Sequence, residues 1–466
     1  MKIEDPSDDG QMAGVESTRV EGVWAHGRRP LTTGLVFTIT LVGFEALAVA
    51  TVMPKIKDDL GGIDLYGWVF SAFFLGNLVG IVWSGRSADH VGPARAFIVG
   101  LALFGGGLAA GGLAPGIGWL VAARAAQGLG AGAIIAMAYV AIGRGYPTSL
   151  QPRMFAIVST AWVLPALLGP GLSGVVADHL GWRWVFLGLL PLVALAAITS
   201  IGAMHRLGPP GGEAPVDRRV DALLVAFGAA LVLIAASSRS PIIAPPLAIV
   251  GFIVGGRAFA RIMPPGTLRL ASGLPSAVAL RGIATFAFFG TDAYVSLTLT
   301  SVHGTSTSVA GIPLTAAALT WTAGAWIQER MVMRVGPRTF VRIGLLVIAS
   351  GIGLMIVVAR ADVPVAVAVI AWAIGGLGMG LSYAPVSLVV LSEAPADNVG
   401  SATASLQLSD TLGIALGTGA SGAIVAAGAS LGWTDGATLS LAFIICIAFA
   451  LFGAAAARRL PAHVAQ

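Results

Sequence analysis

The stretch IGWLVAARAAQGLGAGAIIAMAYVA, residues 117–141, contains a single charged side chain, that of Arg124. A helix rises about 1.5 Å per residue, so this run is long enough to cross the roughly 30 Å apolar layer of a bilayer. Comparable apolar runs recur along nearly the whole chain. They predict about fourteen membrane-spanning helices, at residues 31–54, 66–85, 95–113, 117–141, 154–177, 183–203, 220–237, 242–260, 275–300, 307–327, 341–359, 364–388, 404–427 and 437–457.

The overall composition agrees with a membrane location. Of the 466 residues, 56% are hydrophobic and only 11% are charged, whereas a soluble domain carries about 25% charged residues. Too little polar surface remains to cover a water-soluble globule. The 63 glycines would weaken soluble helices, but in lipid they let helix backbones approach closely. We therefore predict an all-α integral membrane protein, and its single cysteine, Cys446, allows no disulfide within the chain.

The positions of the arginines predict the orientation. With the N-terminus inside, the inner loops and the C-terminal tail hold most of the arginines, and the outer loops hold few basic residues. This positive-inside bias predicts cytoplasmic termini and a cell-membrane location. Residues 1–30 and 461–466 are predicted cytoplasmic tails, the first of them disordered and without the layout of a signal peptide. The spread of basic residues over short loops argues against a nucleic-acid partner despite the net charge of +5.

Two spans have a weak sequence signal. Residues 220–237 and 242–260 are short, and Pro241, Pro245 and Pro246 lie between them or at the start of the second. Removing both spans leaves the parity unchanged, so the charge rule is compatible with twelve spans or fourteen.

An internal repeat divides the chain. The segment 127–132 matches 375–380, and 169–174 matches 417–422, both at an offset of 248, while 91–93 matches 335–337 at an offset of 244. Three matches in order predict two six-helix halves, 31–205 and 271–460, separated by an inserted helix pair and linkers at 206–270. Transporters built from repeats bind their substrate near the midplane between the halves.

Four charged side chains stand out within the predicted spans: Glu45, Arg124, Asp292 and Asp410. Intramembrane charges are costly and usually face a cavity. Glu45 and Asp292 are related by an offset of 247, so we expect both to face the space between the halves. Each charge has a plainer interpretation as a structural partner of a neighbouring helix. Arg281 lies near the inner end of its span, where we expect its long side chain to reach water.

The absence of several catalytic motifs excludes the corresponding enzyme classes. Only three lysines exist, so there is no phosphate-loop Gly-Lys-Ser/Thr, and neither His-Glu-x-x-His, a paired-cysteine metal site nor Gly-x-Ser-x-Gly occurs. The glycine run at 128–132 lies in an apolar helix with no preceding strand, which favours helix packing over dinucleotide binding. Pro165 and Pro170 predict a kink in the fifth span.

The motifs resemble those of the major facilitator superfamily over residues 31–460. The segment 85–95 looks like that superfamily's loop between spans 2 and 3, and His90 departs from the usual Arg. The resemblance implies a gating loop made of Gly85, Asp89, His90, Gly92 and Arg95. His90 is also compatible with a plain surface histidine.

Further motifs resemble the fourteen-span drug–proton antiporters. Arg124 with Gln127 and Gly128 is similar to the family's proton-linked span-4 motif, and Glu45 with Pro54 is similar to its span-1 acid and proline. The segment 181–186 resembles a hallmark of these antiporters. The segment 168–174 is similar to the span-5 antiporter motif, with Pro165 in place of the usual Gly, and the motif residues are Pro165, Gly169, Pro170 and Gly174.

These observations predict a proton-coupled exporter of amphipathic, drug-like compounds. Glu45, Arg124 and Asp292 are the expected proton-coupling residues. The expected substrate cavity contains Glu45, Gln127, Asp292 and Trp162. The expected partners are a small-molecule substrate, protons and membrane lipid, with no nucleic acid, no cofactor and no metal, and the protein is expected to be a monomer and not an enzyme. Two alternatives stay open, an exporter of an endogenous lipid, glycolipid or metabolite, and a sensor or scaffold without transport.

Overall fold

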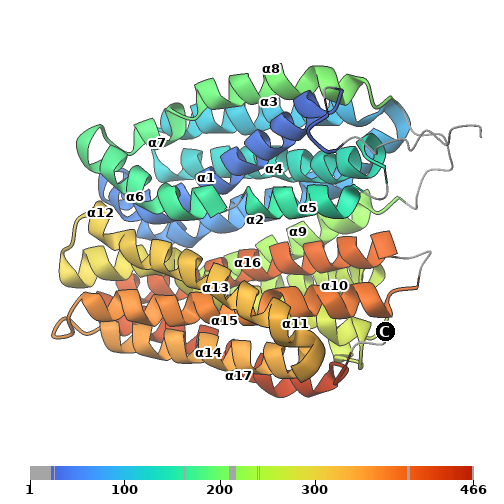
Figure 1. Cartoon of the computed structure of the whole chain (residues 1–466). Coiled ribbons are helices and arrows are strands. Elements are labelled where there is room, and N and C mark those ends of the chain that lie inside the picture. The colour runs from blue at the N-terminus through green and yellow to red at the C-terminus, as the bar shows by residue number, and fades with distance from the viewer. Residues whose placement is uncertain are drawn as a thin grey trace, which may run out of the picture.

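The computed structural model describes residues 22–25, 27–147, 150–161, 163–208, 217–238, 240, 242–395 and 399–463. Figure 1 shows that this part of the chain is helical, and no strand occurs in it. The 3₁₀ turns are η1 (Ile63–Leu65), η2 (Thr267–Arg269) and η3 (Ala457–Arg459). The α-helices are α1 (Arg29–Leu60), α2 (Tyr66–Val91), α3 (Pro93–Gly112), α4 (Ile117–Gly145), α5 (Gln151–Thr160), α6 (Val163–His179), α7 (Arg183–Leu187), α8 (Leu190–His205), α9 (Arg219–Ser237), α10 (Ala244–Ile262), α11 (Leu274–His303), α12 (Thr307–Ala310), α13 (Ile312–Val335), α14 (Pro337–Val358), α15 (Ala366–Glu393), α16 (Val399–Ser430) and α17 (Asp435–Ala456).

Twelve helical segments of the described chain are long and apolar enough to cross a membrane, and α9 and α10 are among them. The all-α membrane fold is therefore confirmed. The other two predicted spans, 154–177 and 307–327, each coincide with a pair of helices, α5–α6 and α12–α13. The pair α5–α6 is interrupted after Thr160, about one turn before Pro165. A proline has no N–H to donate to the carbonyl four residues earlier, and its ring crowds that carbonyl. The count of fourteen spans stays a prediction.

The helices pack in two layers of the same construction (Figure 1). In the first layer α4 packs against α2 and α3, and α1 packs against α6 and α8. In the second layer α15 packs against α13 and α14, and α11 packs against α16 and α17. The helices that correspond follow one another in the same order along the chain.

The repeat also holds at the level of single glycines. Gly128 of α4 lies so close to the backbone of Phe73 in α2 that no Cβ would fit. Gly376 of α15, at the offset of 248, lies equally close to the backbone of Ala317 in α13. Glycine at both positions therefore sets the distance between the corresponding helix pairs, as close packing in lipid requires.

The turns that follow α2 and α13 match as well. Gly92 and Gly336 have φ values of 87° and 89°, which favour glycine, and each is followed by a proline that begins the next helix. α2 extends to Val91, so the predicted loop after residue 85 is largely helical and the turn itself is short. This corrects the predicted loop boundary: the motif residues continue the helix because only Gly92 needs a positive φ.

The layers meet mainly where α2 packs against α16, where α6 packs against α12 and α13, and where α1 packs against α11. The inserted helix α9 packs against both α2 and α16, and α10 packs against α9. The pair α9–α10 thus covers the line along which α2 and α16 meet, outside the two repeated units.

Candidate functional site

A buried ion pair lies in the first layer, between α1 and α4. Arg124 donates to Glu45 and also, at 3.1 Å, to Gln127 Oε1, while its Nε donates to the carbonyl of Val69 at 3.2 Å. Glu45 and Arg124 are each 1% exposed. The guanidinium carbon lies 4.2 Å from the centre of the Phe73 ring. The arginine therefore has four different partners, and Glu45 is the one of them that can change its charge.

Only one of the two carboxylate oxygens of Glu45 has hydrogen-bond partners among the described residues. Oε1 accepts from Arg124 and lies 3.4 Å from Gln127 Nε2, whereas Oε2 is buried without a hydrogen-bond partner among the described residues. A buried acceptor without a donor is unfavourable, and a proton on that oxygen would lower the cost by removing the buried negative charge.

The second layer holds Asp292 at the matching position on α11. Its Oδ1 accepts a 2.7 Å hydrogen bond from Trp372 Nε1 of α15. Trp372 is at an offset of 248 from Arg124, so a neutral donor occupies in this layer the position that a cation occupies in the first. Trp372 was not among the residues predicted from the sequence, although the repeat offset applied to Arg124 leads to it.

A second buried ion pair corrects one expectation. Arg281 of α11 is 3% exposed and does not reach water; its Nη1 lies 3.8 Å from Asp410 Oδ1 of α16. Tyr383 of α15 donates to the other oxygen of Asp410 at 3.1 Å. The arginine turns inward because carbonyl, hydroxyl and carboxylate groups surround it, which a lipid-facing position does not offer.

The residues of the antiporter motif lie in α6, where all four are buried: Pro165, Gly169, Pro170 and Gly174. A Cβ on Gly174 would lie 2.8 Å from Ser308 Cα of the second layer. The repeat-related Gly422 of α16 makes the reciprocal contact, because a Cβ there would lie 2.6 Å from Gly67 Cα of α2. The two glycines thus bring the layers into backbone contact.

These glycine contacts belong to what we name the distal seal, at the end of the bundle opposite the C-terminus (Figure 1). There Asp178 of α6 accepts from the backbone N–H and the hydroxyl of Ser308, at 3.1 and 2.6 Å. Lys55 of α1 lies 3.4 Å from the same carboxylate. Tyr66 of α2 donates to the carbonyl of Ala293 in α11 at 3.2 Å. The seal therefore joins the layers through close backbone contacts at glycines and through hydrogen bonds of Asp178 and Tyr66.

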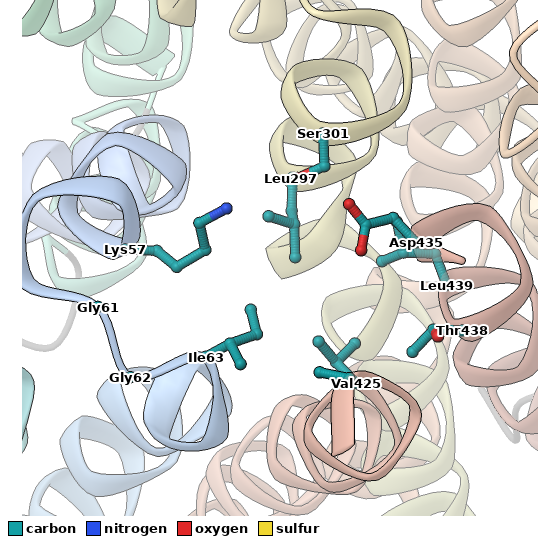
Figure 2. Close-up of a pocket in the computed structure, with 11 residues that line it drawn as sticks. Lys57, Gly61, Gly62, Ile63, Leu297, Ser301, Val425, Asp435, Thr438 and Leu439 are labelled. Atoms are coloured by element: carbon teal, nitrogen blue, oxygen red, sulfur yellow. The ribbon is translucent and has the colours of Figure 1, made fainter. Parts of the chain in front are cut away.

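A cavity of about 330 Å³ opens at the same end, between α1 and η1 of the first layer and α11, α16 and α17 of the second. Figure 2 shows Lys57 and Asp435 reaching toward it from opposite layers, with Leu297 between them and with Ile63 and Val425 on the other side. The cavity has a mixed polar and apolar lining, and neither Glu45 nor Asp292 is among its lining residues.

The remaining predicted site residues are only partly placed. The side chains of Asp89 and His90, and Trp162 altogether, lie outside the described residues. Arg95 is exposed at the start of α3, and Gly85 lies within α2.

Comparison with known proteins places this architecture in a family. The profile of the Major Facilitator Superfamily matches residues 35–260. The chain belongs to this superfamily. It is a multi-pass membrane transporter of small molecules and not an enzyme.

Relatives and solved structures of the superfamily cover most of the chain. A probable multidrug-efflux transporter of Mycobacterium tuberculosis is 28% identical over 88% of this chain and 91% of the relative. The multidrug transporter protein MdtP of Bacillus subtilis is 26% identical over 85% of this chain and 75% of the relative. Crystal structures of a bacterial homologue of the human lysosomal transporter Spinster and of a D-xylose–proton symporter align with TM-scores of 0.65 and 0.63. Each is 15% identical and covers 93% of this chain and 98% of its own, so these two likenesses concern the fold.

Proposed function

We propose that the protein is a proton-coupled exporter of chemically diverse amphipathic compounds, as two relatives are named multidrug transporters. The observation that carries the proposal is the buried pair of Glu45 and Arg124, with one carboxylate oxygen unpartnered. The proposal includes fourteen spans, two halves at 31–205 and 271–460, the inserted pair at 206–270, a monomeric state, a cell-membrane location and cytoplasmic termini. The distal seal then faces the outside.

Proton coupling follows from the partners of Arg124. When Glu45 binds a proton, the ion pair is lost, but Arg124 keeps Gln127, the Val69 carbonyl and the Phe73 ring. The uncharged carboxyl is then free to move with α1. Loss of the proton restores a buried carboxylate that needs Arg124, since breaking such a pair costs about 3–5 kcal/mol. Each charge that crosses the membrane contributes about 2.3 kcal/mol per 100 mV to the export of a solute.

Alternating access would use the distal seal. With the seal closed, substrate and proton exchange with the cytoplasm; when its contacts part, the same site opens outward. The seal suits this role because Gly174 and Gly422 hold the layers by backbone proximity and Asp178 by two hydrogen bonds to Ser308.

A gradient-driven flux assay tests the proposed function. Proteoliposomes with an acidic interior should accumulate the cationic dye ethidium and release it when an ionophore collapses the pH gradient. Protein-free liposomes are the control. Ethidium exchange at the same rate with and without the pH gradient would refute proton coupling. The absence of any ethidium flux or counterflow would favour the sensor or scaffold alternative.

Asp292→Asn should weaken transport of cations selectively. Asp292 has an indole N–H and no cation as its hydrogen-bond partner among the described residues, so its charge is available to a cationic substrate. A hydrogen bond to a charged group is worth about 1.5–3 kcal/mol, so ethidium uptake at low concentration should fall about tenfold or more. The exposed Asp362→Asn is the matched control. An equal loss for an uncharged substrate would argue against a direct contact.

A lipid exporter is the second candidate, because a lateral groove of about 270 Å³ lies between η2 and the helices α10, α11, α16 and α17. Small residues and phenylalanines share its lining, among them Gly282, Gly413, Phe286 and Phe449. Stoichiometric co-purification of one lipid species, lost when the groove is filled by Ala279→Phe and kept in Ala102→Phe on α3, would favour this candidate.

A further inference from the structure

Four aromatic rings form a continuous row in the second layer. Trp372 stacks on Phe288 with ring centres 4.8 Å apart and planes 16° from parallel. Phe288 meets Trp321 edge to face at 5.6 Å, and Trp321 lies 5.4 Å from Tyr383. Three helices supply the row: α11, α13 and α15. We name this set the aromatic row.

A carboxylate stands at each end of the aromatic row. At one end Trp372 donates its indole N–H to Asp292 at 2.7 Å, and at the other Tyr383 donates its hydroxyl to Asp410 at 3.1 Å. Trp372 and Phe288 are buried, whereas Tyr383 and Trp321 are partly exposed. The Tyr383 end is therefore the more accessible end of the row.

The accessible end already holds a planar cation from the protein itself. The guanidinium carbon of Arg281 lies 3.4 Å from the centre of the Tyr383 ring. Its Nη2 donates to the Tyr383 carbonyl at 2.7 Å and to Ser387 Oγ at 2.6 Å. The approach to Asp410 is loose, at 3.8 Å, and both Arg281 Nε and Asp410 Oδ1 are buried without hydrogen-bond partners among the described residues.

We propose that Tyr383, Trp321 and Asp410 form a binding site for planar, delocalised organic cations, and that Arg281 occupies this site as a stand-in until such a cation displaces it. This inference rests on the proposed function and adds a substrate class and a site to it. A planar aromatic cation would cover more of Tyr383 and Trp321 than a guanidinium does. It would also bring its charge to the unpartnered oxygen of Asp410.

In this displacement, the contacts that Arg281 loses are replaced by contacts of the same kind to the ligand. Arg281 keeps its bonds to the Tyr383 carbonyl and to Ser387 while its face leaves the ring, so the protein loses one cation–π contact and a long ion pair. The ligand gains a cation–π contact worth about tenfold in affinity when it is desolvated, and a charge partner. Asp292 lies 11 residues beyond Arg281 on α11, about 16 Å along the helix, so the row leads from this site toward the central carboxylate.

Ethidium binding to the purified full-length protein in detergent, without any gradient, tests the site. Trp321→Leu, Tyr383→Leu and Asp410→Asn should each weaken ethidium binding about tenfold. Arg281→Gln should tighten it several-fold, because the competing cation is gone. Trp326→Leu, on the lipid-facing side of the same helix α13, is the matched control and should leave the affinity unchanged. Melting temperatures identify variants that fail to fold, and Tyr383→Phe, which keeps the ring, should bind more tightly than Tyr383→Leu.

The outcomes separate this inference from the proposed function. Equal ethidium affinities for Trp321→Leu and Trp326→Leu, or weaker binding by Arg281→Gln, would overturn the site even if the protein pumps ethidium along a pH gradient. Binding that depends on Tyr383 and Asp410 in a protein that shows no gradient-driven flux would support the site and refute the exporter.

Discussion

Proteoliposomes that contain the Glu45→Gln variant are expected to accumulate no more ethidium under a pH gradient than protein-free liposomes do. Glutamine fills the same space but cannot exchange a proton, so the partner of Arg124 is permanently uncharged. The variant then remains in a form equivalent to protonated Glu45, and the gradient no longer acts on it. Dye accumulation driven by an imposed pH jump is the measurement.

Two companion variants make this result specific. Glu329→Gln changes an exposed carboxylate of α13 and should pump normally. Glu45→Asp keeps an ionisable group but shortens its reach toward Arg124, so we expect reduced but gradient-dependent accumulation. Undiminished coupled uptake by Glu45→Gln would remove Glu45 from the role of proton carrier, and Asp292 would become the next residue to test.

Gly174→Leu is expected to hold the distal end open and to stop substrate exchange. Even a Cβ at residue 174 would lie 2.8 Å from Ser308 Cα, so a leucine forces α6 and α12 apart whenever the layers close. Overpacking of this kind costs about 1–3 kcal/mol, which lowers the closed population roughly 5- to 150-fold, since about 1.4 kcal/mol is a factor of ten. Both the labelling of a cysteine at the distal end and the flux of ethidium should change in this variant.

Accessibility is measured at an introduced cysteine, Ser301→Cys, which lines the distal cavity, in a Cys446→Ser background. A membrane-impermeant maleimide should label it faster in Gly174→Leu. Gly171→Leu places the same side chain on the same helix where nothing lies within 4 Å, so it is the control for an effect of leucine itself. If both leucine variants label and transport alike, the glycine contact is not a moving seal.

Several features of the site followed from sequence patterns. The offset of 247 paired Glu45 with Asp292, and the structure gives each a hydrogen-bond partner at positions that the offset of 248 relates, Arg124 and Trp372. The antiporter motif indicated a functional segment in the fifth span. Its physical use, close contact of Gly174 with Ser308, was not predictable, because the contact lies between segments more than a hundred residues apart.

Arg281 shows where the sequence argument failed. Its position near the end of a span predicted a side chain that reaches water, but Asp410, Tyr383 and Ser387 come from two other helices and surround it. Position along one helix gives depth in the membrane, and it does not give the direction in which the side chain points.

Hydrophobicity, run length and the repeat were sufficient to determine an all-α membrane protein with corresponding helix pairs, because spanning length and lipid solvation act on each segment separately. Three features were decided by the tertiary structure alone. They are the pairing of the charges, the hydrogen bond from the Trp372 indole, which corresponds to Arg124, to Asp292, and the row of four rings between Asp292 and Asp410. Those contacts depend on helix rotation and crossing, which packing between distant segments sets.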